Sequence, residues 1–460
     1  MVSETHLQIP FSSKRISSVV PGKDRGENEI HQLRNMDLAM KLHYIKGVYF
    51  FDSHAVQGVS VKDLKDAMFP LLDLYVTAAG RIRRSSETGR PMIKCNDAGV
   101  RILEAHCDKT MDEWVAELNK GGANNCFRDD GFCYSHVLGP DLGFSPLVFF
   151  QFTWFKCGGL AVGLSWAHIL GDPLSTHMFI NTWSRIMAGY MPPHPTDHVS
   201  KSQSPELPNP MVFKKPFSTK EIDKPVGDHW LLSTTNNLKM ETHSFQLTAK
   251  NLDRLMSSIG GGNQTSKITS FDVLSSVIWK SLSRIREGLG YSPKMVATIC
   301  HNGNKNNNTH EMEKEMPNNG MVIGTVEAAN LLTSIAEADV LELATLISEN
   351  RVDENDRIEG MIGREDGNGD YVVYGANLTF VNLEGANIYD LEVKGKRPFF
   401  ANYSIDGVGD EGVVLVLPGP KYGKEEGSYG RTVTVVLPED EVSHLRNEMR
   451  RDWGIEEVDN

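Results

Sequence analysis

The spacing of hydrophobic residues along the chain predicts alternating helices and strands. Apolar residues recur at helical spacing across Leu64–Leu74, although Pro70 within this stretch should kink or end the helix. Capping-box patterns predict further helix starts at Thr110–Glu113, Thr269–Asp272 and Ser334–Glu337. β-Branched and aromatic runs predict strands at Leu147–Phe152, Leu160–Leu164, Tyr371–Tyr374, Val413–Leu417 and Thr432–Leu437. The mixture predicts an α/β fold.

The C-terminal end of the chain carries a hairpin pattern followed by a helix pattern. The last two predicted strands flank a loop rich in Gly, Pro and Lys, so we expect them to pair. Pro438 follows the second of these strands, and Glu439 and Asp440 come next. Proline is favoured at the first helical position and acidic residues in the first turn, so a final helix should begin here.

Three segments without hydrophobic periodicity predict the division into domains. They are the N-terminal tail to Glu29, the run 192–228 with its eight prolines, and the Asn-rich run Asn302–Asn319. A chain of 460 residues is too long for one ordinary core. We therefore expect an N-terminal lobe of residues 1–191, a Pro-rich crossover linker of residues 192–228 and a C-terminal lobe of residues 229–460.

Composition and charge narrow the classes of function. Hydrophobic residues make up 40% and charged residues 23%, which is typical of a folded globular protein. The net charge of −13 argues against general affinity for nucleic acid or an anionic membrane surface, but leaves room for a local basic pocket. Six cysteines without a C-x-x-C pair predict neither a disulfide scaffold nor a metal site.

The chain also lacks an apolar run of signal-peptide or membrane-spanning length. We expect a cytoplasmic protein without a transmembrane segment, monomeric by itself.

His168 is the candidate catalytic residue. It follows an apolar strand, and Asp172 lies four residues later. A histidine can take a proton from a hydroxyl or amine near neutral pH, which is what acyl transfer from a thioester requires. About one H-x-x-x-D match is expected by chance in a chain with this many histidines, so a buried core histidine at a strand end explains the pattern equally well.

A serine hydrolase is a weaker alternative. Gly163-Leu-Ser165-Trp-Ala167 resembles a nucleophile elbow, but its last position is not glycine and no partner Asp and His can be singled out downstream.

The residues around His168 match a known family. The run Cys157-Gly-Gly-x-x-x-Gly163-x-x-x-x-His168-x-x-x-Asp172 resembles the active-site segment of the plant BAHD acyl-CoA-dependent acyltransferases. Further family landmarks occur in the same order at Ser18–Pro21, Met36-Asp37, Ala79–Ile82, Cys95–Val100 and Ser270–Ser281. The resemblance covers most of the chain.

The resemblance implies two chloramphenicol-acetyltransferase-like lobes with a channel between them. His168 would be the general base in the middle of the channel, with acyl-CoA and acceptor entering from opposite faces. Asp172 would be structural, with its carboxylate turned away from the substrate, whereas a helical i,i+4 spacing would make it a partner of His168. No resident cofactor is implied, and acyl-CoA would be the co-substrate or ligand.

The chain departs from the family at several places, which include Pro173 after the H-x-x-x-D motif and the segment Ile299–Asn304. The family's D-F-G-W-G signature is matched by Ile405–Gly409, which keeps Gly407 and Gly409 but has Val408 at the tryptophan position. Thr379-Phe380 stands where the family has S-W or T-W beside the acceptor. We expect Thr379, Phe380 and Val408 to line the channel.

Four segments resemble the eceriferum and glossy wax proteins, a BAHD subgroup: Met36–Tyr44, Leu164–Asp172, Gly375–Leu383 and Gly407–Val416. This resemblance implies a plant protein that promotes very-long-chain fatty acid elongation for cuticular wax. Its partner would be an elongase condensing enzyme at the cytosolic face of the endoplasmic reticulum, and its ligand a long acyl chain. The alternative is a catalytic acyl-CoA-dependent O- or N-acyltransferase that uses His168 as general base.

Overall fold

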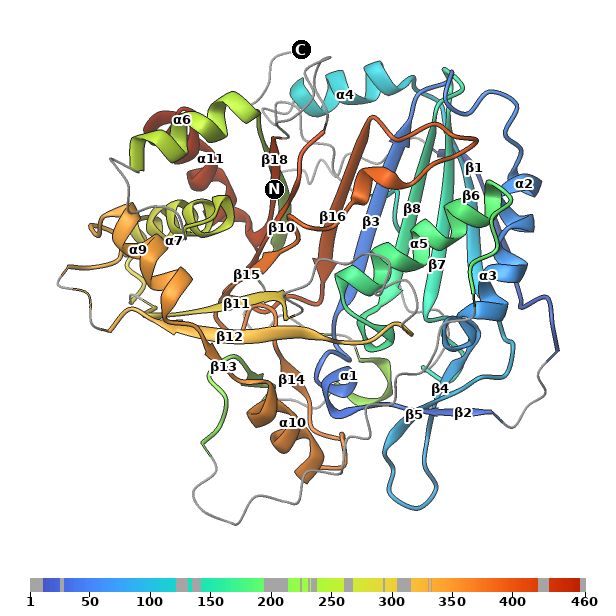
Figure 1. Ribbon diagram of the computed structural model, residues 1–460, viewed down its shortest axis with the longest axis horizontal. Coiled ribbons are helices and arrows are strands. Elements are labelled where there is room, and N and C mark those ends of the chain that lie inside the picture. Colours follow the sequence, from blue (N-terminus) through green and yellow to red (C-terminus); the bar gives the residue numbers. More distant parts are fainter. Residues whose placement is uncertain are drawn as a thin grey trace, which may run out of the picture.

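The computed structural model shows a mixed α/β protein of two lobes, as predicted (Figure 1). It describes residues 11–24, 29–120, 131–134, 142–193, 214–223, 226–230, 232, 238–259, 268–292, 294–303, 316–329, 331, 333–420 and 430–455. Most of the predicted linker and of the Asn-rich run therefore lies outside the described residues. Within the linker, the structure describes the short strand β9 (Lys220–Glu221) and the 3₁₀ turn η3 (Gly227–His229).

The first lobe is built on a six-stranded sheet. Its order is β1 (Phe11–Val19), β6 (Val100–Cys107), β7 (Val148–Phe155), β8 (Leu160–Ala167), β3 (Tyr44–Phe51) and β16 (Phe400–Asp406). The last strand departs from the predicted lobe boundaries, because the C-terminal part of the chain crosses over to pair with β3. Gly47 of β3 leaves room for the ring of Tyr403, whose hydroxyl lies 2.7 Å from that of Tyr49.

The second lobe is built on a seven-stranded sheet. Its order is β10 (Met240–Leu247), β18 (Arg431–Pro438), β17 (Val413–Pro418), β15 (Leu378–Asn382), β11 (Val296–Asn302), β12 (Met321–Glu327) and β13 (Val352–Asp353). Alternate residues of β17 point to opposite faces. Val414 and Val416 pack beneath the helices of this lobe, whereas Leu415 and Leu417 join the core that is continuous with the first lobe. One hydrophobic cluster therefore extends across both lobes, and a second lies within the second lobe.

Helices pack around both sheets (Figure 1). In the first lobe they are α1 (Asn35–Ala39), α2 (Val61–Asp66), α3 (Met68–Leu74), α4 (Met111–Lys120) and α5 (Pro173–Met187). In the second lobe they are α6 (Ala249–Ile259), α7 (Ser270–Gly288), α9 (Val340–Glu349), α10 (Asn355–Arg364) and α11 (Glu439–Trp453). Helices α1 and α10 lie together below the two sheets. The remaining short turns are η1 (Val76–Ala79), η2 (His168–Leu170) and η4 (Ile388–Asp390).

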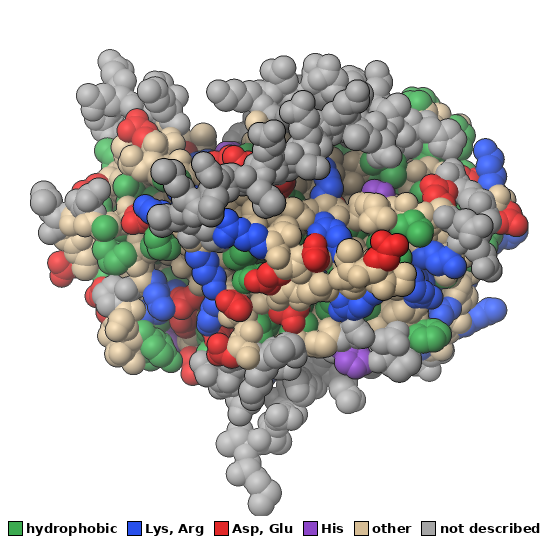
Figure 2. All heavy atoms as spheres, turned by 90° about the horizontal axis from the view of Figure 1, so that it is seen from below, with side chains coloured by type: hydrophobic (Ala, Val, Ile, Leu, Met, Phe, Trp, Pro, Cys, Tyr) green, Lys and Arg blue, Asp and Glu red, His purple; other side chains and the backbone are tan. Residues whose placement is uncertain are grey.

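Two small sheets complete the fold. One has the order β2 (Ile30–Gln32), β5 (Pro91–Lys94) and β4 (Arg81–Arg84), and the other pairs β14 (Tyr371–Val372) with β9. Figure 2 views the molecule from this lower end, where Lys, Arg, Asp and Glu side chains are mixed on the surface.

The predicted helix starts are confirmed at two of three capping boxes. The side chains of Thr110 and Thr269 each accept a hydrogen bond from the backbone three residues later, at the first turns of α4 and α7. Ser334 begins only a turn, so that prediction is wrong. The helix starts at Val340 because the Asp339 carboxylate accepts a hydrogen bond from Leu341 N.

The helix predicted at Leu64–Leu74 is two helices, which meet at Ala67, and Pro70 lies in the first turn of the second. Proline is tolerated there because first-turn N–H groups have no partner within the helix.

The five predicted strands are confirmed, with shifted ends. β17 and β18 pair antiparallel as the predicted hairpin, and α11 begins directly after Pro438. The segment before Glu29 differs from the prediction, because it contains β1. Its residues pair with β6 along the edge of the first sheet, a long-range contact that periodicity does not reveal.

Candidate functional site

β8 brings His168 to the interface between the lobes. All eight residues of β8 are buried, and the backbone N–H of His168 donates to the carbonyl of His43 at 3.1 Å. The His168 side chain has 0% exposed surface. The predicted candidate base therefore lies inside the protein, between the two sheets.

Tyr374 of the second lobe contacts the imidazole ring of this histidine. Its hydroxyl lies 3.0 Å from His168 Nε2, and the tyrosine is also buried. Burial raises the pKa of Tyr374 well above its ordinary value, so its phenol stays protonated. In either tautomer of His168, Nε2 is engaged by this hydroxyl. A substrate hydroxyl could reach Nε2 only by displacing Tyr374.

His43 holds the tyrosine in place. Its Nε2 accepts hydrogen bonds from the backbone N–H groups of Val373 at 3.2 Å and Tyr374 at 3.3 Å. Its ring also packs edge-on against the Tyr374 ring, with centroids 4.9 Å apart. Among the described residues, Nδ1 of both His43 and His168 lacks a hydrogen-bond partner. The site is thus a buried cluster of three rings from both lobes.

Asp172 does not contact His168 but organises the backbone around it. Its Oδ1 accepts from Ser175 N at 2.9 Å, which caps α5, and its Oδ2 accepts from Gly320 N and Met321 N at 3.1 Å each. Burial raises the pKa of this carboxyl, while the N–H groups of these three residues favour its charged form. Asp172 therefore ties α5 to the strand β12.

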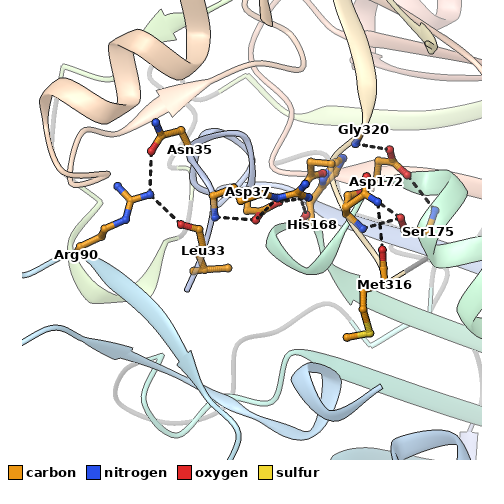
Figure 3. A network of polar contacts seen from close by, with 12 residues as sticks. Leu33, Asn35, Asp37, Arg90, His168, Asp172, Ser175, Met316 and Gly320 are labelled. Atoms are coloured by element: carbon orange, nitrogen blue, oxygen red, sulfur yellow. Dashed lines mark hydrogen bonds and ion pairs between the residues drawn. The ribbon is translucent and has the colours of Figure 1, made fainter. Parts of the chain in front are cut away.

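A second polar chain links His168 to the N-terminal part of the first lobe (Figure 3). Asn319 Nδ2 donates to the carbonyl of His168 and to Asp37 Oδ1, each at 3.0 Å. Asp37 in turn accepts from Arg34 N at 2.9 Å, which completes the capping box of α1. His168 is fixed by these backbone contacts from both lobes.

The glycines predicted as structural lie in a tight turn beside this cluster. Gly407 has φ +76, and a Cβ there would lie 2.1 Å from the carbonyl oxygen of Leu42, next to His43. Gly409 N donates to the carbonyl of Tyr374 at 2.9 Å. Both positions therefore hold the turn after β16 against the site.

The residues predicted to line the channel are buried. Thr379 and Phe380 have 0% exposed surface and Val408 has 4%. The hydroxyl of Thr379 accepts from Gly375 N at 3.2 Å, which fixes the loop after Tyr374, and Phe380 packs beneath the helices of the second lobe. None of the three offers a free surface to a substrate.

Sequence reasoning missed Tyr374, His43 and Asn319 as members of the site. His43 lies in the run Met36–Tyr44, and Tyr374 directly precedes the run Gly375–Leu383. Both runs resemble the wax proteins, so this resemblance could have pointed to the two residues. Ser165, the alternative nucleophile, donates its hydroxyl proton to the carbonyl of Tyr134. It is a structural residue of β8.

No group of three or more His, Cys, Asp and Glu side chains within the described ranges could hold a metal ion. Among the helices that the structure describes, none has the length and apolarity to cross a bilayer.

Burial of the histidines predicts sensitivity to acid. Desolvation lowers the pKa of His168 to about 4, and desolvation together with the nearby His168 ring lowers that of His43 to about 3. In the unfolded chain both pKa values return to about 6.5. Below that pH the unfolded state binds protons that the folded state excludes, so stability falls as the pH drops from 6.5 towards 4.

We expect His168 alone to account for about 2–3 kcal/mol of the free energy of unfolding lost between about pH 7 and pH 4.5. Urea unfolding of wild type and His168→Gln at both pH values measures this contribution as the difference between their pH dependences. Parallel pH dependences would contradict the prediction.

The fold and the site define the class of protein. The arrangement matches what is expected of the BAHD fold. It has two lobes with a shared core, a histidine at the end of a buried strand and a structural aspartate four residues later. The sequence profile described as Transferase family matches residues 11–452. The chain therefore belongs to this family, the BAHD acyltransferases.

Within the family the chain is similar to the eceriferum proteins of Arabidopsis thaliana. It is 41% identical to Protein ECERIFERUM 2 over 451 residues, covering 96% of this chain and 98% of the relative. It is 36% identical to Protein ECERIFERUM 26 over 447 residues, covering 96% of each. The subgroup resemblance drawn from the sequence motifs is confirmed.

Solved structures show the same fold. Vinorine synthase matches with a TM-score of 0.63 and 17% identity over 94% of this chain and 96% of that one. F. graminearum TRI101 complexed with coenzyme A and deoxynivalenol matches with a TM-score of 0.64 and 16% identity, over 93% and 98%. At this identity the likeness shows the fold alone.

Proposed function

We propose that this protein promotes very-long-chain fatty acid elongation for cuticular wax, acting with an elongase condensing enzyme, and that His168 does not transfer acyl groups in this role. The similarity to the eceriferum proteins supports a role in the formation of cuticular wax. The observation that carries the mechanistic part is the contact between Tyr374 and His168 Nε2, because it occupies the atom that a general base must present.

Three features of the site argue against catalysis by His168. His168 has no exposed surface, so an acceptor hydroxyl cannot approach it in this conformation. Its pKa of about 4 lies below the near-neutral value at which a general base works best at physiological pH. His43 holds Tyr374 by its backbone, so the tyrosine is anchored from the same lobe as the histidine that it covers. The proposal therefore assigns His168, Tyr374 and His43 a packing role at the interface between the lobes.

In this proposal the protein acts at the cytosolic face of the endoplasmic reticulum and binds or positions a long acyl chain for the condensing enzyme. The second candidate is an acyl-CoA-dependent O- or N-acyltransferase. It is favoured by the retained His168 and by an Asp172 that stays structural. In that case Tyr374 would have to move aside when acyl-CoA and acceptor bind.

Co-expression with a plant condensing enzyme in yeast distinguishes the two functions. We expect wild type and His168→Ala to lengthen the acyl products equally, measured by gas chromatography of total fatty acids. His168→Gln controls for the cavity, because its amide can still accept from the Tyr374 hydroxyl. Loss of lengthening in both variants, at equal protein level, would show that acyl transfer by His168 is required. If wild type itself leaves chain length unchanged, the elongation function is wrong.

Tyr374→Phe gives an independent test on the purified protein. This change removes the hydroxyl that engages His168 Nε2 but keeps the ring that packs on His43. We expect no transfer from acyl-CoA to alcohol acceptors by the wild type, and unchanged chain lengthening by the variant in yeast. Turnover by the wild type that disappears in His168→Ala would favour the catalytic candidate.

A further inference from the structure

The small sheet β2-β5-β4 carries an unusual excess of positive charge. The stretch from Arg81 to Arg101 contains six Lys and Arg residues but two acidic ones, Glu87 and Asp97, in a chain whose net charge is −13. Figure 2 looks onto the end of the molecule that carries this sheet and shows Lys and Arg side chains there, interspersed with Asp and Glu. This local charge is opposite to that of the whole protein.

Strand register places the basic residues on one face. Arg81 is the cross-strand partner of Lys94, and Arg83 is the partner of Met92. Partners directly opposite each other point to the same side of an antiparallel pair, as do residues two apart along a strand. The opposite side carries the buried residues Ile82 and Ile93, so it faces the core. Arg81, Arg83 and Lys94 therefore share the outer face, although Arg81 itself is buried and contributes its charge from within.

Arg101 extends this surface, and the four residues Arg81, Arg83, Lys94 and Arg101 are called the basic face below. The positive charges of Arg101 and Arg83 both act on Arg81 and, after desolvation, contribute to lowering its pKa to about 10. Like charges repel each other, and an anion bound among them would offset this repulsion.

The hydrogen bonds of the basic face leave its charge uncompensated. Arg81 donates to the carbonyls of Gly80 and Gly99 at 2.7 and 2.9 Å, and Arg83 donates to that of Gly143 at 2.6 Å. Arg101 donates to the hydroxyl of Ser18. Every one of these acceptors is neutral. Within the part of the chain that the structure describes, none of the four residues of the basic face forms an ion pair with a carboxylate.

Exposed apolar side chains border the basic face. Gly143, which accepts from Arg83, is followed by Phe144, and this ring is 64% exposed. On the neighbouring strand, Ile30 is the cross-strand partner of Lys94 and is 48% exposed. Exposed aliphatic and aromatic groups next to unpaired cations form the chemical pattern of surfaces that lie on anionic lipid bilayers.

We propose that the basic face, together with Ile30 and Phe144, docks the protein on the surface of an anionic membrane. Arg and Lys side chains attract the lipid phosphates, while the two apolar groups enter the headgroup region. The face is the outer side of a small sheet rather than a groove, which suits a bilayer better than a peptide. This inference goes beyond the proposed function, because vesicle binding can fail while chain lengthening in yeast succeeds, and the reverse.

Sedimentation with lipid vesicles tests the proposal on the full chain. We expect binding to vesicles of phosphatidylcholine with one-third phosphatidylserine, weakening as salt is added, and no binding to phosphatidylcholine alone. Arg83→Glu with Lys94→Glu should weaken binding at least about tenfold. Lys250→Glu with Arg254→Glu makes the same charge change on the exposed side of α6 in the other lobe and should leave binding unchanged.

Further single substitutions separate loss of membrane binding from loss of folding. Lys94→Glu alone removes no hydrogen bond among the described residues, so its effect is not a folding defect. Phe144→Ser should weaken binding several-fold even at high salt, whereas Tyr291→Ser, at a residue 57% exposed near the end of α7, should not.

Four outcomes would overturn the proposal. The wild type could fail to bind the anionic vesicles, or bind neutral vesicles equally well. Both charge-reversal pairs could weaken vesicle binding equally. Inositol hexakisphosphate could displace the protein fully from the vesicles while Phe144→Ser has no effect on binding. The last of these would indicate a site for a small soluble anion.

Discussion

Asp172→Ala is expected to lower the free energy of unfolding by about 2–4 kcal/mol, because it removes a helix cap and leaves the buried backbone N–H of Met321 without an acceptor. One carboxylate oxygen caps α5 through Ser175 N, and the other accepts from Gly320 N and Met321 N. Met321 is buried, so leaving its N–H unsatisfied costs about 1–3 kcal/mol, whereas Gly320 is exposed and its N–H can bind water. Urea unfolding followed by circular dichroism measures the loss.

Asp339→Ala is the matched control for this substitution. Asp339 is an exposed N-cap whose carboxylate accepts a single backbone hydrogen bond, from Leu341 N at 2.7 Å. Its loss should cost about 1 kcal/mol, as for an ordinary cap. Asp172→Asn retains one acceptor oxygen and should fall between the two. A loss for Asp172→Ala no larger than that for Asp339→Ala would show that the contacts to β12 contribute little.

Gly407→Ala is the second substitution with a large expected effect. Residues with a side chain rarely adopt the φ of +76 found here, and the added Cβ would lie 2.1 Å from the carbonyl oxygen of Leu42. The backbone at the end of the β16–β3 pair must shift to relieve this contact. We expect a loss of about 3 kcal/mol or more in the free energy of unfolding.

Gly395→Ala separates the two causes of that loss. Gly395 has φ +74, nearly the same as Gly407, but no atom lies within 4 Å of the position that a Cβ would take there. Its substitution should cost about 1 kcal/mol from backbone conformation alone. The difference between the two variants measures the close approach of the turn after β16 to the backbone before β3. Equal effects would mean that φ, and not the contact with Leu42, requires glycine at position 407.

The sequence indicated that Asp172 and Gly407 are structural positions, but it did not show which contacts they make. The spacing of Asp172 from His168 fits a helical i,i+4 pair as well as a structural role. In the structure, Pro173 begins α5 and Asp172 caps this helix. The partners Gly320 and Met321 come from the other lobe. The local sequence pattern therefore identified Asp172, and its long-range contacts with Gly320 and Met321 explain what its carboxylate does.

The sequence alone determined the local structure of most elements. Capping boxes at Thr110 and Thr269 and the alternation of β17 and β18 depend on neighbours within a few residues, so they can be predicted without tertiary contacts. The exception at Ser334 follows the same reasoning, because a competing cap five residues later, Asp339, defines the helix start. The motif around His168 likewise identified the family.

Only the tertiary structure decided the state of the site. Tyr374 and His168 are 206 positions apart, and His43 and Tyr374 are 331 apart, so no local pattern could bring them together. Packing of two sheets around a shared core buries all three rings and, by desolvation, lowers the pKa values of both histidines. The sequence thus determined that a candidate base is present, and the packing of the lobes determined that it is covered.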